Sequence, residues 1–303
     1  MSNTNDQDLL YHQDTDFELI ELLLPFVQQK SFLDIGAEKG SFTRFLASKG
    51  FLGGFFEPLP AFAPELQAIA DETNCKFFTY AVDSKDGTAD FFTAFDHDDN
   101  PTTYFSTMHP LTDDERITHK KTTTVTCRSL DSLLEEGLIN KSIGVLKVDT
   151  EGNDLNVLKG MKNIETEVLM CEYFMPGIYS GWELGHPLGL INEAKQLGFN
   201  NYIAIKRIEE FELVSVNNNE FINKQWGNLI FINDNIFKVA KEKINNFIAK
   251  KEVKLIRDFL AVTGNLKAIS QERLDVINNL KQICDERLTL INRLHNELNG
   301  VSN

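Results

Sequence analysis

The sequence predicts an α/β fold in which helices cover a mostly parallel sheet, with a helical extension at the C-terminus. Three observations lead to this prediction. Most apolar segments are short continuous runs and not alternating ones, as in strands that are buried on both faces. The first such run leads through a glycine turn, at Gly36 and Gly40, into a helix with an apolar face. After Asn233 the strand signals stop and the pattern becomes helical.

The predicted elements start with a helix at residues 17–29, which contains the apolar segment FELIELLLPF. Strands are predicted, in chain order, at residues 32–35, 52–57, 76–82, 143–149, 168–174, 201–206 and 227–233. Between residues 83 and 127 the pattern breaks into Thr-rich and Asp-rich segments, which we interpret as extra edge strands and loops. The chain therefore divides into a cofactor-binding domain at residues 1–233 and a helical segment at residues 234–303.

Composition and charge exclude several functions. The 303 residues carry a net charge of −15, and such an acidic surface repels nucleic acid and anionic membranes. No apolar run approaches the roughly 20 residues of a membrane helix, and the polar N-terminus is unlike a signal peptide. The cysteines lack the spacing of metal sites or disulfides; they are Cys75, Cys127, Cys171 and Cys284. We therefore expect a cytoplasmic protein with reduced cysteines and no membrane span.

The glycine turn after the first strand predicts a nucleoside cofactor. Gly36 permits a tight turn, and Gly40 lets the helix start close to the strand and the ligand. A dinucleotide site presents bare amides to a pyrophosphate, and its fingerprint has a further glycine that this turn lacks. Asp34 is unfavourable beside that anion, but it suits the ammonium, sulfonium and ribose diol of S-adenosylmethionine. The alternative interpretation is that Asp34 only caps the helix.

Glu57 ends the second predicted strand and supports the nucleoside interpretation. A carboxylate at this position can accept both hydroxyls of a ribose in a bidentate pair. On its own, Glu57 would be an ordinary acid at a strand end. Its place one strand after the glycine turn favours ribose binding.

A second group of polar residues ends a later strand. Lys147, Asp149 and Glu151 occupy alternate positions just before Gly152. Alternate positions of a strand share one face, and three ionisable groups on a buried face are costly unless they meet a ligand, solvent or one another. Ligands bind at the carboxyl ends of parallel strands, so we expect a reaction site here. A salt-bridged strand end is the alternative.

Six segments, in chain order, carry a resemblance to a known family: FLDIGAEKGSF, FFEPLP, AVDSKDGTADFF, CRSLDSLL, LKVDTEGNDLNVLKG and WGNLIFIN. With these segments the sequence resembles the FkbM family of methyltransferases. The resemblance implies a Rossmann-like class I methyltransferase sheet of seven strands, with the last strand antiparallel. It also implies O-methylation by S-adenosylmethionine, often of sugars or glycosylated metabolites.

The resemblance also assigns cofactor residues in this sequence. Asp34, Gly36 and Gly40 would form the cofactor loop, and Glu57 would bind the ribose. Two further residues, Val82 and Asp83, would lie near the adenine.

Asp149 and Glu151 would line the reaction site by the same resemblance. Asn153 and Asp154 depart slightly from the family pattern, which has a small residue and then a glutamate there.

The reaction itself requires a proton acceptor, because an alcohol must lose its proton when it is methylated. Asp149, Glu151 and Glu172 are candidates, since they lie at or near the ends of two neighbouring strands. A divalent metal held by Asp149 and Glu172 is a further hypothesis, because hard cations prefer carboxylates.

Three loop histidines are the other candidates for the proton acceptor. His186 ranks before His109 and His119, because its Gly- and Pro-rich segment contains Tyr179 and Trp182, which can stack on a sugar. Solvated histidines and a loop anchored by its aromatic residues are the alternatives.

The C-terminal segment contains a tandem repeat, ERLDVINNLKQICD followed by ERLTLINRLHNELN. Its period of 14 residues equals two heptads. The apolar residues Leu274, Ile277, Cys284, Leu288, Ile291 and Leu298 follow a 3-4 spacing, with Lys281 and His295 as polar interruptions and with Leu280 and Leu294 widening the stripe. We expect a coiled coil that makes the protein a homo-oligomer through the residues from Gln271. A helical hairpin docked on its own domain is the alternative.

The prediction from sequence is therefore an S-adenosylmethionine-dependent O-methyltransferase that acts on a small-molecule or glycan acceptor. A NAD-dependent oxidoreductase is disfavoured by Asp34 and by the missing glycine. A cofactor-binding module without catalysis would not need Asp149 and Glu151, and an oligomeric scaffold would need none of the cofactor motifs. The sequence does not distinguish a sugar hydroxyl from another alcohol.

Overall fold

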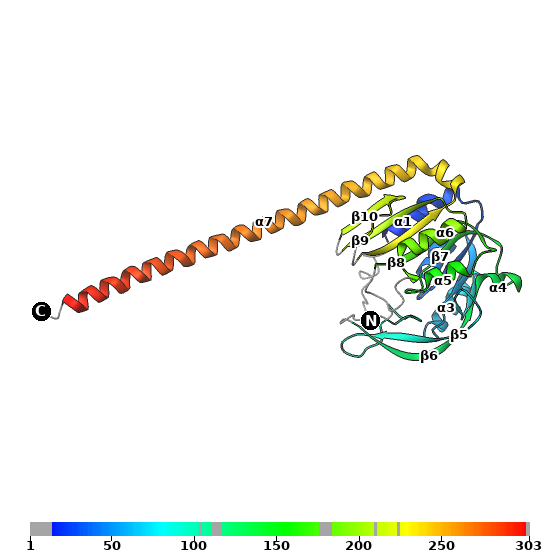
Figure 1. The fold of residues 1–303 in the computed structure, drawn as a ribbon, viewed down its shortest axis with the longest axis horizontal. Coiled ribbons are helices and arrows are strands. Elements are labelled where there is room, and N and C mark those ends of the chain that lie inside the picture. The colour runs from blue at the N-terminus through cyan, green and yellow to red at the C-terminus, as the bar shows by residue number, and fades with distance from the viewer. Residues whose placement is uncertain are drawn as a thin grey trace. The chain divides into compact units, whose positions relative to one another are not determined.

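The computed structural model describes residues 14–102, 105–110, 117–175, 184–208, 211–222 and 225–300. The chain forms two compact units, Met1–Lys251 and Glu252–Asn303. Helix α7 (Asp234–Gly300) contributes to both units. The first unit contains the sheets and the candidate site, and the second is helical (Figure 1).

An eight-stranded sheet forms the centre of the first unit. Its strands are β1 (Ser31–Ile35), β2 (Leu52–Phe56), β3 (Lys76–Phe78), β7 (Ser142–Val148), β8 (Glu165–Phe174), β9 (Asn201–Ile208), β10 (Phe211–Val216) and β11 (Trp226–Ile232). Their order across the sheet is β10-β9-β11-β8-β7-β1-β2-β3. Strands β1, β2, β3, β7 and β8 pair in parallel. Strand β11 runs antiparallel to both β8 and β9, as the resemblance implies.

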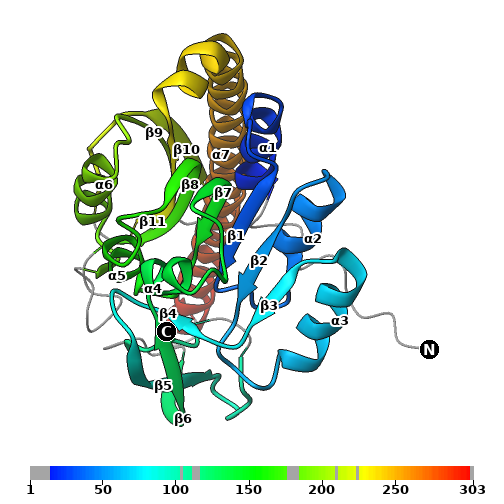
Figure 2. The ribbon, with the colours of Figure 1, turned by 90° about the vertical axis from the view of Figure 1, so that its right-hand side faces the viewer.

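Helices cover both faces of this sheet (Figure 2). One face packs against α1 (Asp14–Leu23), the 3-10 turn η1 (Leu24–Phe26), α2 (Ser41–Ser48), α3 (Ala63–Thr73) and the first part of α7. The other face packs against α4 (Leu130–Glu135), α5 (Asp154–Lys159) and α6 (Pro187–Gln196). The central strands are therefore buried on both sides, which explains their continuous apolar runs.

A smaller sheet accounts for the Thr-rich and Asp-rich region. It contains β4 (Ala81–Val82), β5 (Gly87–Phe95) and β6 (Thr118–Arg128), in the order β4-β6-β5. The strand predicted at residues 76–82 is in fact two strands, because β3 stays in the large sheet whereas Ala81 and Val82 pair with Cys127 and Arg128.

The helix predicted at residues 17–29 is shorter than expected. Helix α1 ends at Leu23, and Pro25 follows in the 3-10 turn. The α conformation is disfavoured at the residue before a proline, here Leu24, which explains why α1 ends at Leu23. Strand β10 was missed, because its partly exposed residues Phe211–Val216 lack a continuous apolar run.

The division between the two units lies inside α7, later than the boundary predicted after Asn233. The cause is the start of α7, where Ile236, Ala240 and Ile244 are buried in the core of the first unit. None of the helices within the described residues combines the length and the apolar character that a membrane span needs.

Candidate active site

The glycine turn after β1 lies directly against the end of β7. Gly36 has φ +77°, and a Cβ at this position would lie 1.8 Å from the backbone oxygen of Asp149. Only glycine fits such a close approach of two backbones with a positive φ. The two polar segments singled out from the sequence therefore meet at the carboxyl edge of the sheet.

Lys147 joins these two segments electrostatically. Its Nζ donates to the backbone oxygen of Gly36 at 2.9 Å and lies 3.2 Å from both Asp34 Oδ1 and Asp149 Oδ2. Burial opposes its charge, but the carboxylates of Asp149 and Asp34 together outweigh burial and raise the pKa of Lys147. Lys147 is therefore a fixed cation that holds the glycine turn.

Asp34 is completely buried, and its carboxylate contacts protein groups. Thr43 Oγ1 donates to its Oδ2 at 2.8 Å, and Lys147 pairs with its Oδ1. The carboxylate therefore ties the start of α2 and Lys147 to β1. It has no exposed surface for a ligand in this structure.

Glu57 lies at the end of β2 beside the glycine turn. Its Oε2 accepts from the backbone N–H of Glu38 at 3.1 Å, and its Oε1 accepts from that of Leu59 at 2.9 Å. Burial raises its pKa to about 7, despite these two hydrogen bonds. Each oxygen of this carboxylate can accept a second hydrogen bond, so Glu57 can still accept one hydrogen bond from each of two hydroxyl groups.

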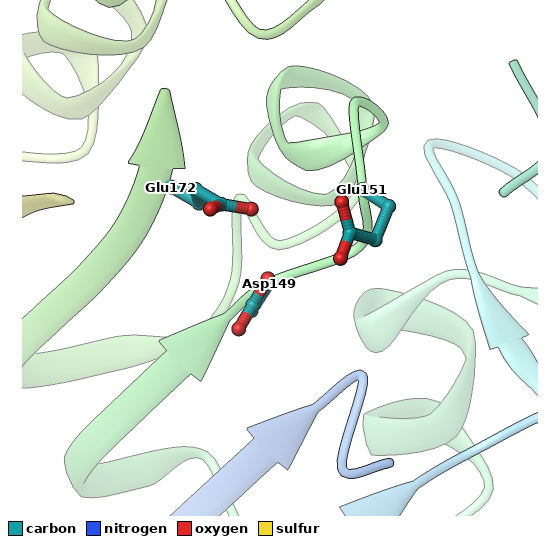
Figure 3. A group of neighbouring side chains, drawn as sticks. All are labelled: Asp149, Glu151 and Glu172. Atoms are coloured by element: carbon teal, nitrogen blue, oxygen red, sulfur yellow. The ribbon is translucent and has the colours of Figure 1, made fainter. Parts of the chain in front are cut away.

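Three carboxylates meet at the ends of β7 and β8. One ligand oxygen from each of Asp149, Glu151 and Glu172 lies within 4.8 Å of the other two. Figure 3 shows the three side chains directed toward a common space. Burial raises the pKa of Glu172 well above its usual range, and the charges of Asp149 and Glu151 raise it further. Without a cation, Glu172 is therefore harder to ionise than an ordinary glutamate.

Asp154, at the first residue of α5, fixes the position of this carboxylate group. Its Oδ1 accepts from the backbone N–H of Thr150 at 2.9 Å and from the Thr150 hydroxyl at 2.5 Å. Its Oδ2 accepts from the backbone N–H of Glu172 at 2.9 Å. Burial raises the pKa of Asp154 to about 6. A single buried carboxylate thus links the Asp149–Glu151 turn to β8.

The family whose description is "Methyltransferase FkbM domain" matches residues 34–200, which is more than half of the chain. The chain belongs to the FkbM methyltransferase family. The match confirms the resemblance drawn from the sequence and the predicted class of enzyme, an S-adenosylmethionine-dependent methyltransferase. It contains every predicted cofactor residue and all four candidate catalytic residues. No curated protein matches this chain.

Solved structures resemble this FkbM methyltransferase only distantly. Magnesium protoporphyrin IX methyltransferase from Synechocystis PCC 6803, with bound SAM, is 10% identical with a TM-score of 0.41, covering 77% of this chain and 87% of that chain. The N-terminal domain of EvdMO1, with SAH bound, is 12% identical with a TM-score of 0.40, covering 76% and 85%. Precorrin-6y C5,15-methyltransferase from Geobacter metallireducens GS-15 is 7% identical with a TM-score of 0.37, covering 72% and 88%. Similarity this low supports no argument about substrate or site.

The segment between β5 and β6 of this FkbM methyltransferase contacts the Glu151 turn. The Thr107 hydroxyl donates to the backbone oxygen of Glu151 at 2.6 Å, and the backbone N–H of Phe105 donates to Glu151 Oε1 at 3.3 Å. His109 Nε2 lies 3.0 Å from Oδ1 of Asn153. The link between β5 and β6 therefore supplies contacts to the Glu151 turn that the sequence pattern did not reveal.

Asn153 also connects this turn to the predicted adenine residues. Its Nδ2 donates to the backbone oxygen of Val82 at 3.1 Å. Asp83 follows Val82, and its Oδ1 accepts from the backbone N–H of Ser84 at 2.6 Å. Asn153 and Asp154 looked from the sequence like a minor departure from the family pattern. In the structure they hold the site together.

The other two candidate histidines have structural contacts. His186 caps α6, since its Nδ1 accepts from the backbone N–H of Leu188 at 3.3 Å, and burial lowers its pKa. His119 Nε2 lies 2.7 Å from the backbone oxygen of Phe105. A catalytic role for His186 stays a prediction. Tyr179 and Trp182 lie outside the described residues.

Proposed function

We propose that the chain transfers the methyl group of S-adenosylmethionine to a hydroxyl oxygen, at the carboxyl edge of β1, β7 and β8. The observation that carries the proposal is the meeting of Asp149, Glu151 and Glu172 next to the glycine turn. A carboxylate group there can take the proton that an alcohol loses. The family match independently supports a methyltransferase.

The residues around the glycine turn suit the cofactor. S-adenosylmethionine supplies an electrophilic methyl group on a sulfonium. Glu57 would accept the ribose hydroxyls, because its two oxygens retain hydrogen-bonding capacity at the end of β2. Val82 and Asp83 would lie near the adenine, and Gly40 would start α2 beside the cofactor. Asp34 would act through Lys147, which holds the oxygen of Gly36.

The chain's part in the chemistry is alignment and proton transfer. The bound cofactor would supply the methyl group with its sulfur as the leaving group, and a carboxylate of this chain would accept the proton that the acceptor hydroxyl loses. Asp149 is the best candidate for this proton acceptor, because its side chain is 37% exposed and Lys147 orients it. Glu172 is less suited, because burial and the charges of Asp149 and Glu151 raise its pKa and oppose its ionised form. The acceptor is proposed to be a sugar or a glycosylated small molecule, which the family resemblance supports.

A divalent cation would suit the same group of carboxylates. Asp149, Glu151 and Glu172 offer three hard oxygen ligands, the type that Mg²⁺ and Ca²⁺ prefer. Among the residues that the structure describes, none forms a hydrogen bond with the buried Oε2 of Glu172. A cation would supply Lewis-acid help in removing the acceptor proton.

The decisive experiment separates turnover from cofactor binding. Asp149→Asn should lower turnover by about 10²–10⁴-fold, measured as S-adenosylhomocysteine formed with a panel of glycosides and polyols. Its affinity for S-adenosylhomocysteine, measured by calorimetry, should change much less. Glu167→Gln is the matched control, because Glu167 lies on β8 and binds the backbone of Gln28 and Gln29. Unchanged turnover in Asp149→Asn and in Glu151→Gln would reject the proposed reaction site.

A further inference from the structure

The second unit contains a longer and more regular heptad pattern than its last 33 residues alone indicate. In the heptad notation a to g, the a positions are Phe259, Leu266, Arg273, Leu280, Arg287 and Leu294. The d positions are Leu255, Val262, Ile269, Val276, Ile283 and Leu290. Ten of these twelve residues are apolar, and the two exceptions are both arginines. The a and d residues together form one seam along the helix. The apolar stripe described from the sequence, from Leu274 to Leu298, lies beside this seam at positions b and e.

The strict period of seven residues indicates a supercoiled partner helix. A straight α-helix drifts by about 20° per heptad relative to a 3.5-residue repeat, so a straight stripe would wander by about 100° over five heptads. A helix that packs on a globular domain does not need its apolar residues to keep a strict seven-residue repeat. Helices that wind around one another do need this repeat, because it keeps the apolar seam facing the partner helix.

Apolar side chains of this unit that the structure describes are exposed, as expected for the surface of an interface with further chains. Val253 and Ile256 are 56% and 60% exposed. Leu274 is 49% exposed. Soluble proteins rarely leave such a run of large apolar side chains in water.

Charge identifies the partner as further copies of this chain. Residues 252–300 carry seven Lys and Arg and seven Asp and Glu, so the segment is neutral although the whole chain has a net charge of −15. The two arginines of the seam each follow a glutamate at a g position, Glu272 before Arg273 and Glu286 before Arg287. Position g flanks the seam, so each arginine can pair with the glutamate of a neighbouring copy.

We propose that residues 255–294 form a parallel coiled coil of three or four copies of this chain. Leu at a with β-branched residues at d favours assemblies larger than two strands. The apolar residues Ile256, Ile277 and Ile291 at e positions widen the apolar seam, which also favours an assembly of more than two strands. The interface is independent of the methyl-transfer site, since no residue of that site belongs to it.

The test is the mass of the full-length protein in solution, by light scattering or sedimentation equilibrium. We expect three to four times the 34.4 kDa of one chain. A mass of one chain would mean that the helix packs on its own domain or on an unrelated protein, and it would overturn the proposal. A mass of two chains would also overturn it.

Charge variants test the register. Arg273→Glu with Arg287→Glu should lower the mass by at least twofold, and adding Glu272→Arg with Glu286→Arg should restore it. The matched control is Lys254→Glu with Arg257→Glu, which makes the same charge change at positions c and f, outside the seam. Affinity for S-adenosylhomocysteine should stay within about twofold in all of them. An unchanged mass in the Arg273/Arg287 variant, or an equal loss in the control, would overturn the register.

Orientation is tested by a cysteine in the seam. Leu280→Cys, in a Cys284→Ala background, places one thiol per chain at an a position. In a parallel assembly these thiols meet, so oxidised glutathione should join chains by an interchain disulfide. An oligomer that does not cross-link would reject the parallel orientation.

Discussion

Oδ2 of Asp154 accepts a hydrogen bond from the backbone N–H of Glu172 at 2.9 Å. The contact joins the first residue of α5 to the carboxyl end of β8, while Oδ1 of the same carboxylate holds Thr150. Asp154 therefore determines how Asp149 and Glu151, on one side, face Glu172 on the other. It acts on the site without belonging to the group of three carboxylates.

Asp154→Asn tests this positioning role. The amide group of Asn has one acceptor oxygen in place of two, so at least one buried donor loses its partner and stability should fall by about 1–3 kcal/mol. Turnover should fall by about 10–100-fold, as for other residues that orient a reacting group, while S-adenosylhomocysteine affinity changes little. Denaturant unfolding, turnover and calorimetry measure the three effects.

The control for this variant is Asp131→Asn. Asp131 also holds a loop, since its oxygens accept from the backbone N–H groups of Lys162 and Asn163 at 3.0 and 2.8 Å. It should lower stability without lowering turnover. Equal losses of turnover in the two variants would mean that Asp154 contributes only to folding.

Gly36→Ala tests the contact between the glycine turn and β7. The added Cβ would lie 1.8 Å from the Asp149 oxygen, so the turn must move away from the strand and the contact of Lys147 with Gly36 must lengthen. Binding of S-adenosylhomocysteine should weaken by more than tenfold, with a clear loss of stability. Gly137→Ala is the control, because Gly137 has φ +70° but, apart from its two chain neighbours, no described residue has an atom within 4 Å of the added Cβ. It should cost only the conformational strain of about 1–2 kcal/mol. Similar effects of the two variants would contradict the close approach.

Glu57 predicts how cofactor affinity depends on pH. Its pKa of about 7 means that most of it is protonated at pH 6 and ionised at pH 8. Only the ionised form offers all its lone pairs to the ribose hydroxyls, so affinity should rise by up to about tenfold over this range. Calorimetry with S-adenosylhomocysteine at both pH values measures it. In Glu57→Gln affinity should be lower and this rise should disappear; a rise that persists would assign the titration to another group.

The sequence predicted the large sheet well, because its inner strands are buried on both faces and appear as continuous apolar runs. It also placed Asp149, Glu151 and Glu172 at the ends of two neighbouring strands, and the topology brings them together. Their proximity could be predicted because the carboxyl ends of neighbouring parallel strands lie at the same edge of the sheet.

Other features depend on contacts that no local pattern reveals. Asp34 was interpreted as a ligand for the cofactor, but its partners Thr43 and Lys147 are set by the packing of α2 and by the alignment of β1 with β7. The contact of Thr107 with Glu151 joins residues 44 apart. Asp154 was noticed only as a departure from a pattern, because its three donors come from two separate elements.

Glu172 gives a final prediction, about a cation and pH. Its folded-state pKa is raised by burial and by the charges of Asp149 and Glu151. A divalent cation favours the ionised form of this carboxyl group, so binding of Mn²⁺ or Ca²⁺ to the full-length protein should release protons and should tighten as the pH rises. Calorimetry in buffers of different ionisation enthalpy measures both quantities. In Glu172→Gln the affinity should fall by at least tenfold.

The same residue makes an independent prediction for the metal-free protein. Between the unfolded pKa of about 4.3 and the higher folded value, the folded state binds a proton that the unfolded state has lost. Stability contributed by this group therefore declines as the pH rises through that window. Glu172→Gln removes the titration, so it should raise the melting temperature at pH 7–8 and have little effect at pH 4. If Glu172→Gln destabilises the metal-free protein equally at both pH values, the raised pKa is wrong, and the proposed competition between proton and cation fails with it.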